Sequence, residues 1–335
     1  MGFKARKATK MPPIPYQFAS HPLVQDLPGT PGRFPTDQGF DEWFGIPNSS
    51  DEAYWPNSDP FAGPEYVMES AKGQAPKKLK VYDLAYRRII DRQLTDKTKD
   101  FITRQVKAGK PFFAFVPYTM VHHPVTPAPE FDGKTGNGYW ADALAQMDAY
   151  TGELLDTVDK LGVKDNTIFI FTSDNGPEMI EPWNGWAGPW RGTYFTGLEG
   201  SLRVPFIIRW PGKISAGGVS NEIVHEMDIF TTVAAIVGGK VPTDRAIDGV
   251  DQSQFFLGKQ DKSKRDGFVV YVGSEVYGVK WENWKMMFKE LQTGTGPVEQ
   301  WSIPRFFNLN LDPKEEHSLS YAADTDGCVS RWVRY

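Results

Sequence analysis

Cysteine is nearly absent from the sequence, which contains one residue of this type, Cys328. A single cysteine excludes an intrachain disulfide and a metal site built from several thiolates. Long apolar runs are missing too: none reaches the ~18 residues of a membrane-spanning helix, so we expect no membrane span. Positive charge is not in excess, because the net charge is −5, which argues against general binding of nucleic acid.

The N-terminal residues are basic but have no apolar stretch after their charges, so they do not form a secretory signal as written. The sequence as it stands therefore predicts a cytoplasmic chain. Apolar and aromatic residues are plentiful, at 40% and 14% of 335 residues, which supports a large core and argues against global disorder. This length fits one large domain or a domain with a subdomain.

Helical and strand patterns alternate between residues 84 and 172. Residues 84–109 and 138–162 have the apolar spacing of amphipathic helices, and each of these stretches ends near a glycine. Residues 111–118 and 167–172 are short apolar runs that are typical of buried strands. The order helix–strand–helix–strand predicts a parallel sheet covered by helices.

The rest of the chain is less regular. Further segments are assigned as follows: residues 1–60 as an extended, loop-rich lead-in, 178–203 as a long functional loop, 204–210 as a strand, 222–237 as a helix, 266–290 as a small antiparallel sheet, and 306–311 as another strand. We place a subdomain boundary near 258–266. The predicted organisation is a lead-in (1–33), an α/β domain (34–258) and a small C-terminal antiparallel β subdomain with a tail (259–335).

Polar residues follow the strand predicted at 167–172. Asp174 and Asn175 come directly after it, and ligands bind at the carboxyl ends of strands in open α/β sheets. A carboxylate and an amide oxygen suit a hard divalent cation. The alternative is an ordinary turn, because Asp-Asn and Asn-Gly pairs end many strands.

A second polar group follows the strand predicted at 111–118, where His122 and His123 precede Pro124. A histidine beside a cation suits hydrolysis of an anionic ester, since an imidazole can protonate the leaving oxygen. The alternative is a turn residue ahead of the proline. In the long loop, Arg191 and Arg203 could bind an oxyanion, but Arg203 fits equally well as an ion-pair partner.

Ordered blocks of the sequence resemble sulfatases of the arylsulfatase type, within the alkaline-phosphatase-like superfamily. The matching blocks are FPTDQGFDEWFGIPNS (34–49), PFFAFVPYTMVHHPVTP (111–127), TIFIFTSDNG (167–176), EGSLRVPFIIRWPG (199–212), DGVDQSQFFLG (248–258) and FNLNLDPKEEH (307–317). Several blocks in family order are far more specific than one motif.

The resemblance implies an alkaline-phosphatase-like α/β/α sandwich with a mostly parallel sheet, incomplete at the N-terminus, plus a small C-terminal antiparallel subdomain. It also implies hydrolysis of sulfate esters, with a small sulfate ester or a sulfated glycan as substrate. Family members are often periplasmic, secreted or lysosomal.

Site residues are assigned only where the family's motifs match. Asp174 and Asn175 then bind calcium, and His122 contacts the sulfate or its leaving oxygen. Tyr194 occupies the place of a family lysine that is aimed at the sulfate, and Arg191 is the candidate to substitute for that lysine.

The sequence lacks the family motif that supplies the nucleophile. The family nucleophile is a formylglycine made from a Cys/Ser-x-Pro-x-Arg motif, and this motif does not occur here; the segment at Cys328 has no proline and lies at the wrong end. The paired aspartates that complete the calcium site are also missing. Motif order implies that the chain begins about where the family's N-terminal third ends.

These absences predict a weak, partial calcium site, because calcium takes six to eight oxygen ligands. They predict little or no turnover by this chain alone, since the covalent route is lost. Uncovered surface would favour a complementing chain or self-association. Three alternatives stay open: a non-catalytic anion-binding remnant, one half of a split enzyme, and a phosphodiesterase or phosphonate hydrolase of the same superfamily.

Overall fold

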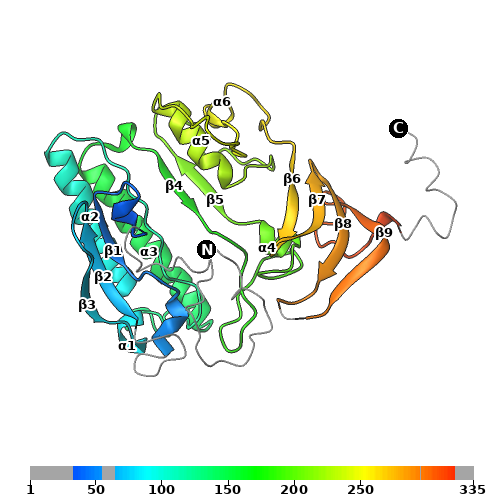
Figure 1. Cartoon of the computed structure of the whole chain (residues 1–335), viewed down its shortest axis with the longest axis horizontal. Helices are drawn as coiled ribbons and strands as arrows, with labels where there is room; N and C mark the ends of the chain where they lie inside the picture. Colours follow the sequence, from blue (N-terminus) through cyan, green and yellow to red (C-terminus); the bar gives the residue numbers. More distant parts are fainter. Residues whose placement is uncertain (1–32, 55–64, 295, 321–335) are drawn as a thin grey trace. The chain divides into compact units, whose positions relative to one another are not determined.

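The computed structural model describes residues 33–54, 65–294 and 296–320, which divide into two compact units (Figure 1). The first unit runs to Val163 and includes Ile180–Trp183. The second comprises Lys164–Met179 and the chain from Asn184 onward. The domain boundaries expected at residues 34 and 258 stay predictions.

The first unit combines a small sheet with two long helices. Its described elements are η3 (Pro35–Asp37), β1 (Glu42–Gly45), η4 (Ser50–Tyr54), β2 (Tyr66–Ala71), β3 (Lys77–Val81), α1 (Leu84–Arg87), α2 (Ile90–Lys107) and α3 (Tyr139–Lys160). Strands β1, β2 and β3 form an antiparallel sheet in that order. Strand β1 lies inside the stretch predicted as a loop-rich lead-in, so that prediction is wrong there. Four of the five residues of β3 are exposed, and a polar, exposed strand has no apolar run to reveal it.

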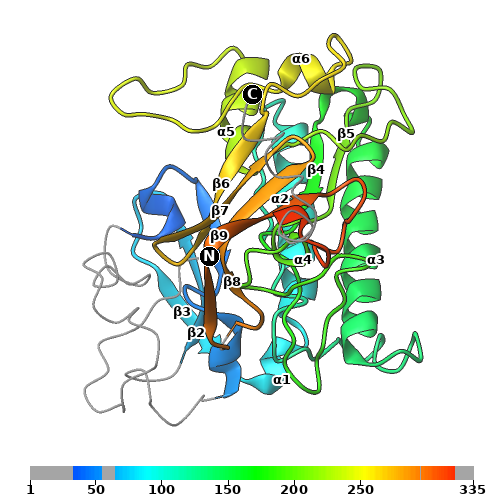
Figure 2. The same ribbon diagram turned by 90° about the vertical axis from the view of Figure 1, so that its right-hand side faces the viewer.

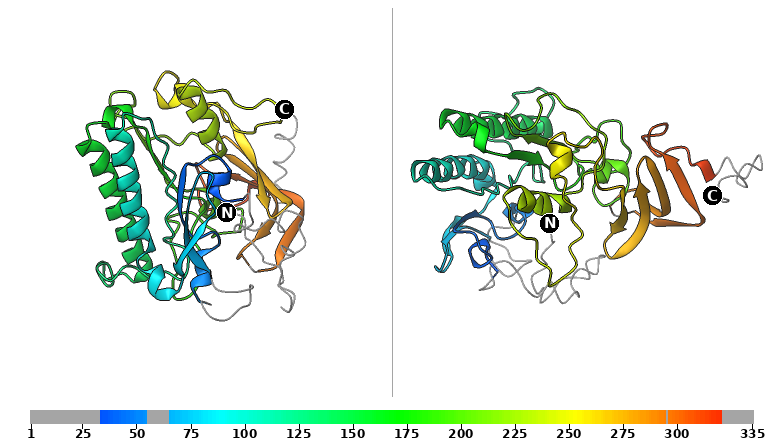
Figure 3. Two further views of the ribbon diagram at one scale, coloured as in Figure 1. Left: turned by 60° about the vertical axis from the view of Figure 1, so that its left-hand side comes forward. Right: turned by 90° about the horizontal axis from the view of Figure 1, so that it is seen from above.

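The helices predicted at 84–109 and 138–162 are confirmed. Helices α2 and α3 lie side by side (Figures 1 and 3). Glu153 of α3 joins them, since it pairs with Arg92 at 2.6 Å and with Lys99 at 2.7 Å. Gly109 and Gly162 follow the two helices with φ of 64° and 73°, a left-handed conformation that glycine adopts without strain. No helix among the described residues is long and apolar enough to cross a bilayer.

The main core of the first unit lies between strand β2, helix α1 and the start of α2. It consists of Ala53, Val67, Tyr82, Tyr86 and Ile90. A second cluster, Met120, Val125 and Ala143, packs the turn after residue 118 against α3. This second cluster fixes the segment in which His122 and His123 lie.

Residues 111–118 do not form the predicted strand within the described part of the chain. The segment keeps the alternating exposure of a strand, with Phe113 and Phe115 exposed at 65% and 70%. The apolar pattern correctly indicates extended backbone, but a strand also requires a neighbour for its hydrogen bonds. None of the described strands lies beside this segment in a ladder.

The second unit is built from two sheets and short helices. Its described elements are η5 (Lys164–Asn166), β4 (Phe169–Thr172), α4 (Glu199–Leu202), β5 (Phe206–Arg209), α5 (Met227–Ile236), α6 (Ser253–Phe256), β6 (Gly267–Val272), β7 (Glu275–Trp281), β8 (Trp284–Leu291) and β9 (Val298–Asn308). The strands predicted at 167–172 and 204–210 and the helix predicted at 222–237 are confirmed as β4, β5 and α5.

The predicted parallel direction of the sheet is not met within the described residues. Strand β4 pairs with β5 antiparallel, from Phe169 opposite Arg209 to Thr172 opposite Phe206 (Figure 2). Every other ladder in the described residues is antiparallel as well. A short apolar run indicates burial, but it contains no information about the direction of the neighbouring strand.

The C-terminal antiparallel sheet is confirmed. Strands β6, β7, β8 and β9 pair in sequence order, with the first strand beginning at Gly267. Its core consists of Val270, Tyr277, Met287, Leu291, Phe307 and Leu309, against which Leu202 of α4 packs. The strand predicted at 306–311 begins earlier, at Val298. The sheet and the segment around α4 therefore form one packed body.

Candidate functional site

His122 lies in the turn after residue 118 of the first unit, with its imidazole held through Nδ1. This nitrogen is 2.6 Å from the carbonyl oxygen of His123 and 3.0 Å from Oγ of Ser50. Because a carbonyl can only accept, Nδ1 must donate, and in the neutral ring Nε2 is then the unprotonated nitrogen. The hydroxyl of Ser50 can accept from Nδ1 while it donates to the His123 carbonyl at 3.4 Å. One arrangement of protons thus satisfies all three contacts.

A buried charged pair, Arg87 and Asp91, binds the backbone of the turn from Thr119 to His122. Arg87 is fully buried; its Nη2 donates to the carbonyl oxygens of Thr119 at 2.9 Å and of His122 at 2.8 Å, and its Nη1 donates to the Thr119 hydroxyl. Asp91 accepts from the Thr119 N–H at 2.8 Å and from its hydroxyl at 2.9 Å. Burial raises the pKa of the Asp91 carboxyl, although Arg87 and the bonds from Thr119 favour the charged form.

Asp174 and Asn175 lie in the second unit, just beyond strand β4. Their side chains are adjacent, because Nδ2 of Asn175 donates to Oδ1 of Asp174 at 3.2 Å. Asp174 is exposed and Asn175 is half-buried. Loss of hydration, and after it the negative charge of Asp174, raises the pKa of Glu226, so a second carboxyl lies within electrostatic reach of Asp174. The pattern of the sequence gave no sign of this glutamate.

Oxygen ligands of this kind have the chemistry that calcium prefers. Asp174 and Asn175 offer a carboxylate and an amide oxygen, and Glu226 is the nearby carboxylate. Calcium takes six to eight oxygen ligands. These residues therefore have the right chemistry for the ion but supply too few oxygens to complete its coordination. The Cys/Ser-x-Pro-x-Arg motif does not occur in the sequence, so no residue of this chain fits formylglycine.

Close backbone packing fixes the turn after β4. The N–H of Gly176 donates to the carbonyl of Ser201 at 2.8 Å, and the N–H of Tyr194 donates to the carbonyl of Pro177 at 3.0 Å. A Cβ on Gly176 would lie 1.8 Å from the carbonyl oxygen of Gly200. Only glycine permits this approach, which brings the Asp174–Asn175 turn against α4 and against the loop that contains Tyr194.

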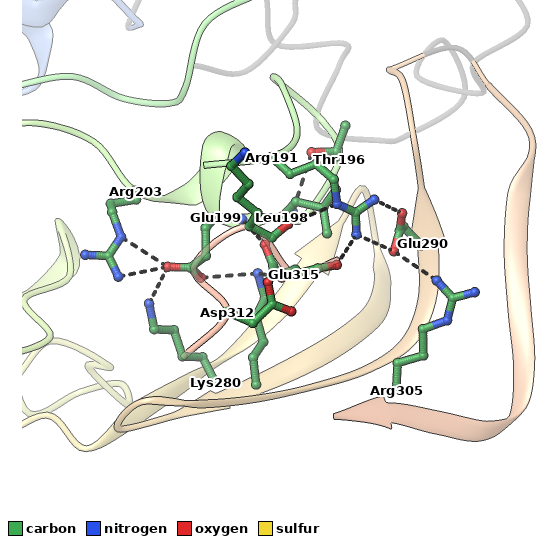
Figure 4. Close-up of polar contacts among 12 residues, drawn as sticks. Arg191, Thr196, Leu198, Glu199, Arg203, Lys280, Glu290, Arg305, Asp312 and Glu315 are labelled. Atoms are coloured by element: carbon green, nitrogen blue, oxygen red, sulfur yellow. Dashed lines mark hydrogen bonds and ion pairs between the residues drawn. The ribbon is translucent and has the colours of Figure 1, made fainter. Parts of the chain in front are cut away.

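Arg191 is engaged by other residues of the second unit, among them the buried Glu290. Its guanidinium pairs with Glu290 at 2.6 Å and donates to the carbonyl oxygens of Lys314 at 3.1 Å and of Glu315 at 2.7 Å (Figure 4). These contacts favour a structural role over sulfate binding. Arg203 pairs with Glu199 at 3.2 Å, which agrees with the ion-pair role, one of the two alternatives that the sequence left open for it.

Tyr194 is half-buried, and its ring centroid lies 4.1 Å from that of Phe195. Phe195 has a φ of 70°, an uncommon conformation for an aromatic residue. The structure thus brings Asp174, Asn175 and Tyr194 into one unit through backbone bonds, whereas His122 belongs to the other unit.

Sequence reasoning missed the residues that hold His122. Ser50 and Arg87 contact it from 72 and 35 positions away in the chain. The spacing of Arg87 and Asp91, four apart beside apolar residues, is the available signal for a buried pair; Ser50 gave none.

Comparison with known proteins identifies the family. The family model described as "Sulfatase" matches residues 24–239, and the model described as "N-sulphoglucosamine sulphohydrolase, C-terminal" matches residues 194–331. The first of these ranges contains all of the site residues predicted from the sequence: His122, Asp174, Asn175, Arg191 and Tyr194.

Individual relatives agree with the family models. The chain is 31% identical to an N-acetylgalactosamine-6-sulfatase of Mus musculus, over 88% of this chain and 60% of the relative. It is 35% identical to a steryl-sulfatase of Rattus norvegicus, over 69% of this chain and 44% of the relative. The chain thus spans 60% or less of the length of these two relatives.

Solved structures support the same assignment. The PsFucS1 sulfatase from Pseudoalteromonas sp. is 30% identical, with a TM-score of 0.80 over 86% of this chain and 63% of that one. The fold is accordingly the α/β fold of the alkaline-phosphatase-like class, with a C-terminal antiparallel sheet. From the matched residues and this likeness, the chain belongs to the sulfatase family.

Proposed function

We propose that the chain takes part in the hydrolysis of sulfate esters, with His122, Asp174 and Asn175 in the roles that the family motifs give them. The observation that carries the proposal is the sulfatase match over residues 24–239, which includes all three residues. The chain spans only 60% of the mouse relative. That this chain has the activity of a whole sulfatase is therefore proposed here and does not follow from the match alone.

His122 is proposed to act on the leaving oxygen. Its Nδ1 is engaged by His123 and Ser50, so the proton that its cationic form can transfer is the one on Nε2. Donating this proton, or a hydrogen bond, to the ester oxygen stabilises the negative charge that develops as the S–O bond breaks. Arg87 and Asp91 hold the backbone of the same turn and thereby orient the ring.

Asp174 and Asn175 would hold calcium, which when bound neutralises charge on the sulfate oxygens. The hydroxyl of Tyr194 is the proposed contact to the sulfate, and Arg191 is the weaker candidate because its guanidinium is already engaged. The substrate class that we propose is a sulfated sugar or another small sulfate ester, in line with the mouse relative named N-acetylgalactosamine-6-sulfatase.

The sequence offers no activated nucleophile, since the Cys/Ser-x-Pro-x-Arg motif is absent. The chain alone should therefore show little or no turnover. Purified chain would be incubated with a chromogenic aryl sulfate, and with N-acetylgalactosamine 6-sulfate, in the presence of calcium. The proposed inactivity fails if ester is turned over and the turnover disappears in both His122→Ala and Asp174→Ala. Turnover that appears only after a chain with the nucleophile motif is added would support a complementing partner.

Calcium should bind weakly, because Asp174 and Asn175 supply a minority of the ligands that the ion requires. We expect the thermal unfolding midpoint to stay constant at micromolar calcium and to rise only at roughly millimolar concentrations. Asp174→Asn should remove that rise, whereas Asp244→Asn, on an exposed aspartate paired with Arg245, should leave it unchanged. A rise at micromolar calcium would contradict the partial site.

A further inference from the structure

A buried cluster of opposite charges lies between α4 and the C-terminal sheet of the second unit. Lys280 of β7 and Lys285 of β8 lie directly opposite each other in the ladder, and both are buried. Like charges in such a cross-strand pair repel, so this pair requires a counter-ion. Glu199 supplies it, with its carboxylate 2.7 Å from Nζ of Lys280 and 3.2 Å from Nζ of Lys285.

Further charges complete the cluster around Glu199. Arg203 reaches the same carboxylate at 3.2 Å, and Figure 4 shows Arg203 and Lys280 converging on it. Glu315 pairs with Lys285 at 2.8 Å and accepts from the backbone N–H of Glu199 at 2.7 Å. Burial raises the pKa of Glu199, but the positive charges of Lys285 and Lys280 outweigh it and hold this pKa at about 2. Glu199 is thus fixed to the sheet by its side chain and by its backbone.

The residues that follow Glu199 touch the turn beyond β4. Ser201 accepts the N–H of Gly176 at 2.8 Å, and the Gly200 carbonyl occupies the place that a Cβ on Gly176 would need. Gly200 in turn donates to the carbonyl of Arg191 at 2.8 Å. A continuous path therefore runs from the lysines of the C-terminal sheet, through α4, to the Asp174–Asn175 turn.

We propose that Glu199 is a positioning residue for the Asp174–Asn175 turn, and that the Lys280–Lys285 pair of the C-terminal sheet acts through it. The C-terminal sheet then contributes to the proposed cation site without touching the ion. This inference deepens the proposed function, since the importance of the turn rests on that function. The contacts themselves do not depend on it.

The test is amide hydrogen exchange of the full chain, read at the peptide that contains Gly176. Lys280→Met removes one of three cations from Glu199 and leaves Lys285 and Arg203 in place, so the fold should survive. We expect exchange in residues 172–178 to accelerate about tenfold or more, because a hydrogen bond to a charged group stabilises by more than a neutral one. Lys280→Arg should restore the protection.

Lys289→Met is the matched control, because Lys289 lies on the same sheet and pairs with the exposed Glu275. It should leave exchange in residues 172–178 unchanged. Glu199→Gln is the second variant, with the same expected selective loss. Uniform acceleration across helices and strands, or unchanged exchange at 172–178 in Lys280→Met, would overturn the proposal.

The exchange measurement needs neither calcium nor turnover, so its failure is distinguishable from failure of the proposed function. Repeating the calcium titration on Lys280→Met adds a functional readout. A weakened calcium response together with selective exchange supports positioning of the proposed ligands. Selective exchange with a calcium response equal to that of the unmodified chain would overturn the link to the cation site.

Discussion

Arg87→Met is expected to lower the free energy of unfolding by about 3–5 kcal/mol, the usual cost of removing one partner from a buried charged pair. Arg87 is fully buried, and Asp91 beside it would keep its carboxylate without the nearby cation. Three hydrogen bonds to Thr119 and His122 would be lost as well. Urea unfolding of the two proteins measures the difference.

Acid should reduce this penalty. Burial already raises the pKa of Asp91, and loss of Arg87 raises it further, so as the pH falls the folded variant takes up a proton at Asp91 before the unfolded chain does. A raised folded-state pKa favours folding below the unfolded pKa and penalises it above. The difference between the two proteins should therefore shrink as the pH falls from 7 towards 4.

Arg88→Met is the control for the neighbouring position. Arg88 pairs with Asp132 at 2.7 Å, and both side chains are partly exposed, so its removal should cost less than about 1 kcal/mol. Equal losses in the two variants, or a penalty for Arg87→Met that does not change with pH, would contradict the role given to the buried pair.

Gly176→Ala is expected to cost about 3 kcal/mol or more, because the added methyl group meets backbone and not a movable side chain. Its Cβ would lie 1.8 Å from the Gly200 carbonyl oxygen and 3.0 Å from Cα of Ser201. Relief requires the turn and α4 to separate, which breaks the bond from Gly176 to Ser201. The thermal unfolding midpoint should fall, and the calcium response should be lost.

Gly152→Ala is expected to change the free energy of unfolding in the opposite direction. Gly152 lies inside α3, and nothing occupies the space that its Cβ would take. Alanine in a helix interior should raise the free energy of unfolding by roughly 0.5–1 kcal/mol. If Gly176→Ala were as well tolerated as Gly152→Ala, the close approach between the turn and α4 would not exist in solution.

The sequence predicted those helices and strands that are determined by the pattern of residues within a single segment. Helices α2 and α3 follow from their apolar spacing and from the glycines at 109 and 162. The antiparallel C-terminal sheet follows from short alternating runs between turn residues. The direction of the β4–β5 ladder and the β1–β2–β3 sheet did not follow, because strand pairing depends on neighbours that are distant in the chain.

The same distinction holds for the site. Asp174 and Asn175 were predicted because they end a strand, and one segment contains the whole signal. The contact of Arg191 with Glu290 joins residues 99 positions apart, so the loop sequence alone left sulfate binding open for Arg191. The positions of Ser50 and Arg87 beside His122 likewise depend on tertiary folding.

The extended segment 111–118 also has a consequence that depends on the concentration of the chain. Because Phe113 and Phe115 are exposed and the run between Pro111 and Pro117 has high β propensity, we expect this run to favour intermolecular strand pairing. The rate of folding is proportional to the concentration of unfolded chain, whereas the rate of pairing between chains rises at least with the square of that concentration. The yield of folded protein should therefore fall at high expression levels. The charge of Lys110 and the missing N–H groups of Pro111 and Pro117 should limit this pairing at the two ends of the run.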